Sequence, residues 1–270
     1  MKSEIIPIFS TIMQQVDFDD NGLNKQLEDY AYKLKKNSQG RMLTNRGGFQ
    51  SKLIDMGQPP VVCEKFLRLV MPEIDKYIQK YNLKSSYSLS VGELWFNISG
   101  KGHYNTPHQH VHADFSAVYY VKATDDAGDL EIETPDLRQE MKRFYWSNRD
   151  NFEYNAHNSL KYVVTPKPGR LVVVPSHMRH MVERNETDED RISLAFDMLL
   201  HTVNINDVPQ FENGQPKSEE DKAKLTKSYN KALGDHASNQ IGLMGRGDSK
   251  KLSARNTVWK DKFRKKLDEV

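Results

Sequence analysis

Short runs in which apolar and polar residues alternate dominate the chain between residues 86 and 204. The segment Tyr87–Ile98 alternates and is rich in aromatic residues, and Asp129–Glu133 alternates strictly, which is the period-two pattern of a β-strand. Five further runs have the same character, at residues 115–121, 162–165, 170–175, 180–184 and 191–198. Seven or more short strands separated by glycine, proline and asparagine turn signals predict an all-β sandwich or barrel.

Two amphipathic helices are predicted in front of these strands. In Leu23–Lys36 the apolar residues recur at spacings of three and four, and Asp20 or Asn21 could cap the first turn. A second helix is predicted at residues 60–81, with a kink or a break at Pro72 because proline has no backbone N–H to donate. Two helices ahead of a β domain make the predicted fold class α+β.

The predicted domains are 1–204, the strands with their helices, and 205–270, a linker followed by a basic helical C-terminal extension. A helix is expected at Lys217–Leu233 within this extension. Residues 217–270 hold 14 Lys and Arg against 8 Asp and Glu, a net charge of +6, which leaves −4 on residues 1–216 because the whole chain carries +2. The basic extension predicts either a solvated helical surface or a contact for nucleic acid or another protein.

The remaining composition favours a reducing cytoplasm. Hydrophobic residues make up 37% of the 270 residues, enough for a sizeable core. Cys63 is the only cysteine, so no intrachain disulfide can form. No apolar run approaches the roughly 20 residues that cross a bilayer, and the first residues lack the apolar stretch of a signal peptide. We therefore expect no membrane partner.

The histidines are concentrated in one part of the chain. Four of the nine, His103, His108, His110 and His112, lie within ten residues. A β-strand directs residues i and i+2 to the same face, so His108 and His110 could grip one metal ion side by side. If the strand stays extended, His112 and Asp114 share that face, and spacing alone does not decide which pair is used.

A third ligand must come from elsewhere, and His180 is the best candidate. It follows a turn, an apolar strand and a second turn, whereas His177 would point in another direction. The alternative interpretation is that these are ordinary surface or core histidines.

Arg191 indicates what kind of small molecule could bind beside the metal. It heads an apolar strand eleven residues after His180, with Ser193 on the same strand face. A buried arginine is costly unless it pairs with an anion, and its planar fork fits a carboxylate. A dicarboxylate that chelates the metal at one end could be anchored here at the other. The alternative is an exposed arginine paired with Asp188, Glu189 or Asp190.

Together these residues resemble the 2-oxoglutarate/Fe(II)-dependent oxygenase superfamily, and within it a less-characterised branch found in bacteria and bacteriophages. The resemblance spans roughly residues 5–200 and rests on the order of several short elements. These elements are Pro7-Ile8-Phe9, Asn45-Arg46-Gly47-Gly48-Phe49-Gln50-Ser51, Trp95-Phe96-Asn97, His108-Gln109-His110, Ser116-Ala117-Val118-Tyr119-Tyr120, Pro166 to Gly169, Pro175-Ser176 through His180, and Arg191-Ile192-Ser193.

The resemblance implies a double-stranded β-helix core of the jelly-roll or cupin-like type. It implies Fe(II) bound by His108, His110 and His180, with 2-oxoglutarate as cosubstrate. Arg191, with Ser193, would hold the far carboxylate of 2-oxoglutarate, and Tyr119 and Asn97 would face the cavity and touch it. The implied activity is that of a dioxygenase, a hydroxylase that couples oxidative decarboxylation of 2-oxoglutarate to C–H hydroxylation of an unknown substrate.

The chain departs from the family pattern at three positions. Most of the superfamily has Asp or Glu where this chain has His110, and the branch has proline and glycine where this chain has Val111 and Ala117. A ligand pair of His112 and Asp114 is the alternative, but that register leaves almost no turn before the strand that holds Tyr119. His108 and His110 are therefore the predicted pair.

Two other functions share the same residues. A cupin-like metalloprotein without 2-oxoglutarate would keep the histidines, but Arg191 would be dispensable. A non-catalytic structural or interaction protein of the same fold, for example of a phage, would not bind iron.

Overall fold

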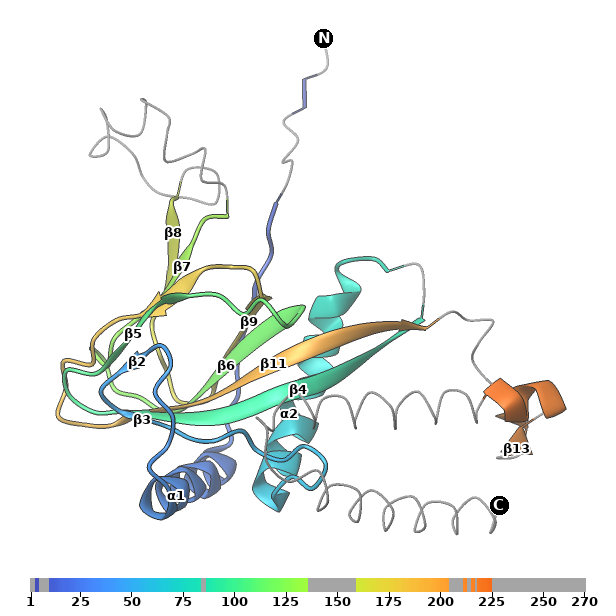
Figure 1. Ribbon diagram of the computed structural model, residues 1–270. Coiled ribbons are helices and arrows are strands. Elements are labelled where there is room, and N and C mark those ends of the chain that lie inside the picture. Colours follow the sequence, from blue (N-terminus) through green and yellow to red (C-terminus); the bar gives the residue numbers. More distant parts are fainter. Residues whose placement is uncertain are drawn as a thin grey trace. The chain divides into compact units, whose positions relative to one another are not determined.

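The computed structural model describes residues 3–4, 10–83, 86–135, 159–203, 211–212, 215–216 and 218–224 (Figure 1). The chain divides into two compact units, Met1–His201 and Thr202–Val270. In the second unit, besides residues 202 and 203, the described residues form β12 (Phe211–Glu212), β13 (Gln215–Pro216) and a helical stretch at 219–224. Most of the predicted extension 205–270, including the rest of the helix expected at Lys217–Leu233, lies outside the described residues.

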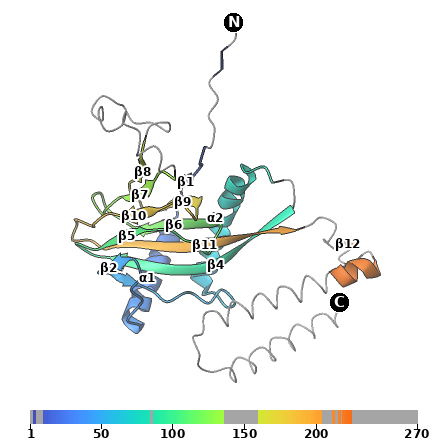
Figure 2. The same cartoon turned by 45° about the horizontal axis from the view of Figure 1, so that its top comes forward.

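Two β-sheets form the body of the first unit. One has six strands in the order β1-β9-β6-β11-β4-β3, and the other has five in the order β2-β5-β10-β7-β8. The strands are β1 (Gln14–Asp17), β2 (Asn45–Arg46), β3 (Phe49–Gln50), β4 (Ser86–Ser99), β5 (Tyr104–His108), β6 (Phe115–Lys122), β7 (Leu130–Glu133), β8 (Lys161–Val164), β9 (Arg170–Pro175), β10 (His180–Val182) and β11 (Arg191–Val203). The long neighbouring strands β4 and β11 run side by side in Figure 2.

From β4 to β11 the chain crosses back and forth between the sheets, and only β7 and β8 are consecutive in one sheet. This crossing, with antiparallel pairing such as that of β6 with β11 and with β9, is the topology of a double-stranded β-helix, or jelly roll. The predicted core fold is therefore confirmed.

Two helices cover the outer face of the six-stranded sheet (Figure 1). Helix α1 (Asn21–Asn37) begins where the Asp20 carboxylate accepts a hydrogen bond from the backbone N–H of Leu23 at 2.8 Å, so Asp20 is the cap. The sequence predicts either a kink or a break at Pro72. Helix α2 (Val61–Gln79) continues through Pro72, so no break occurs there.

Both faces of the six-stranded sheet are buried, because alternate side chains of its strands pack into two different apolar clusters. In β9, Leu171 and Val173 belong to the apolar core under the helices, whereas Val172 and Val174 pack with Leu130 and other residues of the second sheet. Successive side chains of a strand point to opposite faces, so every second residue of β4, β6, β9 and β11 faces the space between the sheets. That space is where the candidate site lies.

None of the described helices is both long enough and apolar enough to cross a membrane.

Candidate metal centre

Three imidazole rings meet between the two sheets. His108 is the last residue of β5 and His180 the first of β10, and the two are direct cross-strand partners. The ring centroids of His108 and His180 lie 4.4 Å apart, and each lies 5.2 Å from the ring of His110. One ligand atom from each residue lies within 4.8 Å of the others, so the three side chains could hold a metal ion.

The hydrogen bonds of the rings fix which nitrogen faces the centre. The Nδ1 atom of His108 lies 2.7 Å from the carbonyl oxygen of Thr106, and that of His180 lies 2.9 Å from the carbonyl oxygen of Met178. A carbonyl can only accept, so Nδ1 carries the proton in both rings and Nε2 keeps its lone pair for a metal.

His110 lies two residues beyond the end of β5, so it is not on the strand that the spacing argument assumed. Its backbone N–H donates to the carbonyl oxygen of Ser176 at 3.0 Å, and its Nδ1 lies 2.8 Å from an oxygen of Asp197. The ring stacks on Trp95, with centroids 5.8 Å apart and an angle of 17° between the planes. These three contacts, and not the geometry of a strand, orient the ring toward those of His108 and His180.

Burial keeps His108 and His180 in the form that binds metals. It lowers the pKa of His180 to about 4, with a further contribution from the neighbouring His108, and it also lowers the pKa of His108. Both rings are therefore neutral near pH 7, as a metal ligand must be.

The other candidate ligands lie apart from this group. His112 and His177 are exposed. The ring of His103 accepts a hydrogen bond from the backbone N–H of Gly100 and packs on Gly47, where a Cβ atom would lie 2.2 Å from it. Asp114 accepts a hydrogen bond from the backbone N–H of Leu200 at 2.8 Å. The alternative pair of His112 and Asp114 therefore does not meet His180.

Arg191 is buried, with 4% of its surface exposed. Its Nη1 atom donates to the carbonyl oxygens of Ala127, Gly128 and Glu183, all of which are neutral. The acidic residues considered as its partners are engaged elsewhere: Asp188 pairs with Lys101, Glu189 pairs with Lys122, and Asp190 accepts from the hydroxyl of Tyr32. Burial lowers the pKa of Arg191, and the charge of Asp129 opposes the shift. Among the described residues no carboxylate forms an ion pair with the guanidinium, which favours a bound anion as its partner.

Unpaired polar atoms gather beside this arginine. Tyr120 is the direct cross-strand partner of Ser193, and the side-chain amide of Asn97 lies 3.5 Å from the Ser193 hydroxyl. Within the described part of the chain, the Tyr120 hydroxyl and Asn97 Oδ1 are buried without a hydrogen-bond partner. Burial raises the pKa of Tyr120 to about 12 although the Arg191 cation opposes the shift, so the phenol is a neutral donor near pH 7.

The prediction that Tyr119 faces the cavity is wrong. Its hydroxyl donates to Asn24 of α1 at 2.7 Å, and its ring packs on Phe66 of α2 with centroids 5.0 Å apart. It therefore points under the helices, and the adjacent Tyr120 occupies the face between the sheets. Sequence reasoning missed Tyr120 because both tyrosines are fully buried and alternation alone does not say which face is which.

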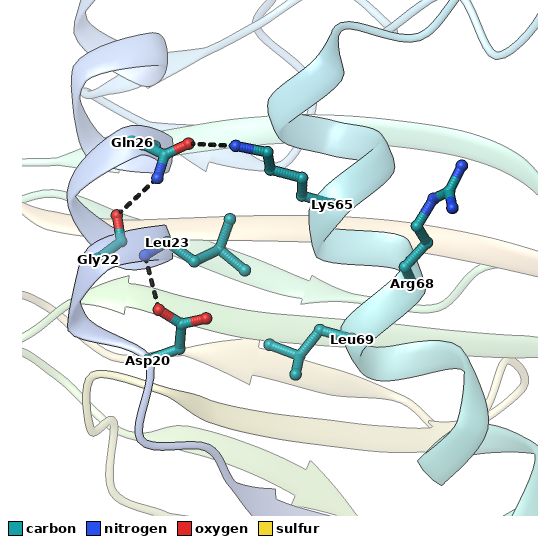
Figure 3. Close-up of a pocket in the computed structure, with 7 residues that line it drawn as sticks. All are labelled: Asp20, Gly22, Leu23, Gln26, Lys65, Arg68 and Leu69. Atoms are coloured by element: carbon teal, nitrogen blue, oxygen red, sulfur yellow. Dashed lines mark hydrogen bonds between the residues drawn. The ribbon is translucent and has the colours of Figure 1, made fainter.

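A pocket of about 440 Å³ lies elsewhere, between α1 and α2 (Figure 3). Its lining is mixed in charge, with Asp20 capping α1 and Lys65 donating to Gln26 at 3.1 Å. None of the residues that line it belongs to the histidine cluster or to the surroundings of Arg191.

Comparison with known proteins agrees with this geometry. Residues 93–197 match the family model described as "Putative 2OG-Fe(II) oxygenase", which confirms the resemblance to 2-oxoglutarate/Fe(II)-dependent oxygenases. The match includes all three clustered histidines, Arg191 and Asp197. No curated protein sequence matches the chain.

Several solved structures are similar to the chain at low sequence identity. A Pseudomonas putida prolyl-4-hydroxylase is 20% identical, with 70% of this chain and 93% of that chain covered and a TM-score of 0.49. An oxidoreductase of the 2OG-Fe(II) oxygenase family from Burkholderia pseudomallei is 15% identical, with 71% and 87% covered and a TM-score of 0.49. A viral collagen prolyl hydroxylase from Paramecium Bursaria Chlorella virus-1 is 13% identical, with 69% and 94% covered and a TM-score of 0.45.

Proposed function

Because residues 93–197 carry the sequence pattern of the 2OG-Fe(II) oxygenase family, we propose that this protein is an Fe(II)- and 2-oxoglutarate-dependent oxygenase that hydroxylates its substrate. The observation that carries the proposal is the pairing of two features between the sheets: three clustered imidazoles, and a buried arginine that forms no ion pair with a carboxylate among the described residues. Dioxygen would supply one oxygen atom to a substrate C–H bond and the other to succinate, as 2-oxoglutarate loses carbon dioxide.

The donor set fits such a metal. Imidazole nitrogens bind Fe(II), and His108, His110 and His180 each engage Nδ1 in another contact, which leaves Nε2 for the metal. Three protein ligands would leave the remaining positions of such an ion for a chelating cosubstrate and for dioxygen. Iron bound there would supply the redox chemistry, and the protein's part is to orient the ligands and shield the site.

The polar group around Arg191 fits the far carboxylate of 2-oxoglutarate. The guanidinium provides charge, and the hydroxyls of Tyr120 and Ser193 provide hydrogen bonds from the same face of β6 and β11. In a buried site these donors hold a carboxylate strongly because water does not compete. Asn97, beside Ser193, would contact the cosubstrate or a water that accompanies it.

The experiment that tests the function is an anaerobic titration of the Fe(II)-loaded protein with 2-oxoglutarate. A weak visible charge-transfer band should appear when the cosubstrate chelates the iron, and admission of air should then produce succinate. Iron binding without the band would favour the cupin-like metalloprotein. Failure to bind iron at all would favour the non-catalytic protein of the same fold.

Exchange of each neighbouring tyrosine for phenylalanine separates their two roles. Tyr120→Phe should raise the Kd for 2-oxoglutarate about tenfold or more, since a hydrogen bond to a charged group contributes roughly 1.5–3 kcal/mol. The free energy of unfolding of Tyr120→Phe should not fall, because the hydroxyl that this variant loses has no hydrogen-bond partner among the described residues.

Tyr119→Phe is the matched control. It loses the hydrogen bond to Asn24 and should lower the free energy of unfolding by about 1 kcal/mol, with no change in cosubstrate affinity. Thermal unfolding and binding titrations of both variants measure the two effects. If Tyr119→Phe weakens cosubstrate binding and Tyr120→Phe does not, the assignment of the two faces is reversed.

A further inference from the structure

A carboxylate stands directly behind one of the three clustered imidazoles. Asp197 on β11 accepts a hydrogen bond from Nδ1 of His110 through Oδ2 at 2.8 Å, and from the hydroxyl of Ser116 through Oδ1 at 2.7 Å. Ser116 is its direct cross-strand partner on β6. Only 13% of the Asp197 side chain and 15% of the His110 side chain are exposed. The carboxylate is thus held in one orientation by two bonds.

Neither of the other two imidazoles has such a partner. His108 and His180 donate from Nδ1 to the backbone carbonyls of Thr106 and Met178. A carbonyl orients a ring but adds no charge, whereas a carboxylate orients it and also makes Nε2 a stronger electron donor. The contact of His110 therefore differs in kind from the other two.

The charge matters because the three clustered side chains are all neutral donors. A dication held by three imidazoles has no anionic protein ligand to offset its charge. Asp197 places one negative charge at the distance of a hydrogen bond from His110, in a buried space where electrostatic interactions are weakly screened.

We propose that Asp197 is a positioning residue of the metal centre, which acts through His110 and supplies the negative charge that the three ligands lack. The inference rests on the proposed function for the identity of the metal site, but it concerns a residue that contacts no ligand of the iron other than His110. Ser116 holds the Asp197 carboxylate in place, and Trp95 holds the His110 ring. Asp197 determines which nitrogen of His110 carries the proton and how strongly Nε2 donates to a metal.

The test is the affinity of the metal-free, full-length protein for Zn²⁺ and Co²⁺, measured by competition with a chelator. Asp197→Asn should weaken binding 10- to 100-fold, the range found when partners of this kind are removed. Asparagine keeps the shape but removes the charge. Its amide can also donate to Nδ1, which would move the ring proton to Nε2, where it blocks the metal.

Asp114→Asn is the matched control, because Asp114 is an acidic residue directly before β6 whose carboxylate accepts from a backbone N–H rather than from an imidazole. Its metal affinity should equal that of the wild type. The absorption spectrum of bound Co²⁺ should change in Asp197→Asn and remain unchanged in Asp114→Asn. A purely structural role of Asp197 would lower the unfolding temperature of the metal-free protein without changing that spectrum.

A double variant shows whether Asp197 acts through His110. In a His110→Ala background, Asp197→Asn should cause a clearly smaller loss of affinity than in the wild-type background, because only the through-space effect of its charge remains. The proposal is overturned if Asp197→Asn binds metal as the wild type does, or if it causes the same loss with and without His110. A wild-type protein that binds no metal would overturn the proposed function itself, so the two failures are distinguishable.

Discussion

Replacing His180 by alanine should weaken the binding of divalent metal roughly 10²- to 10³-fold. A site of four protein ligands stabilises zinc by roughly 10–16 kcal/mol, so one ligand contributes about 2.5–4 kcal/mol. His180 lies opposite His108 across the β5–β10 pair, and its loss leaves two donors on one side of the ion. Titration of the metal-free variant with Zn²⁺ or Fe(II) measures the effect.

His177→Ala provides the control for this variant. His177 lies three residues earlier, is exposed, and is not part of the cluster, so its removal should leave metal affinity within about twofold. The charge-transfer band with 2-oxoglutarate should disappear in His180→Ala and persist in His177→Ala. Equal affinities of the two variants would mean that the metal is held by other residues.

The strands and helices of the first unit could largely be predicted from the sequence, because their patterns arise from burial on a defined face. The alternation of Asp129–Glu133 and the cap at Asp20 both reappear in the structure. The short edge strand β1, with the sequence Gln-Gln-Val-Asp, was missed. Its residues have little strand preference of their own, and it forms because β9 offers it a partner.

The clustering of His108 and His110 could be predicted because i and i+2 spacing survives a change in local structure. His110 lies outside β5, yet its ring still meets that of His108. The assignment of Tyr119 failed for a different reason: β6 is buried on both faces, so hydrophobicity does not distinguish its two sides. The hydrogen bond to Asn24 decides the side, and that contact joins residues 95 positions apart.

Asp197 was also missed, although the sequence contains a signal for it. In β11 the residues Ile192, Leu194 and Phe196 are apolar, and the polar residues Ser193 and Asp197 lie on the opposite face. A strand that is buried on both faces but polar on one of them indicates a functional interior. Only the fold shows that His110 comes to lie against that polar face.

Arg191→Met should weaken the binding of 2-oxoglutarate about 30-fold or more while leaving metal affinity within a few-fold of the wild type. Removing one partner of a buried, hydrogen-bonded charge pair costs roughly 2–5 kcal/mol, which is about 30-fold or more in Kd. Arg191→Lys keeps the charge but loses the planar fork, and it should bind more weakly than the wild type and more tightly than Arg191→Met. Anaerobic titration of the Fe(II)-loaded variants, with the charge-transfer band as signal, measures these affinities.

The stability of these variants needs a separate measurement, because Nη1 of Arg191 also bonds three backbone carbonyls. Carbonyls left unpaired in a buried position cost roughly 1–3 kcal/mol, so Arg191→Met should unfold at a lower temperature and must be titrated below it. Arg184→Met is the control, since Arg184 is exposed and stacks over the ring of Tyr104 at 5.5 Å. If Arg191→Met binds metal and 2-oxoglutarate as the wild type does, the arginine only holds its loop, and the cupin-like metalloprotein becomes the better explanation of the three histidines.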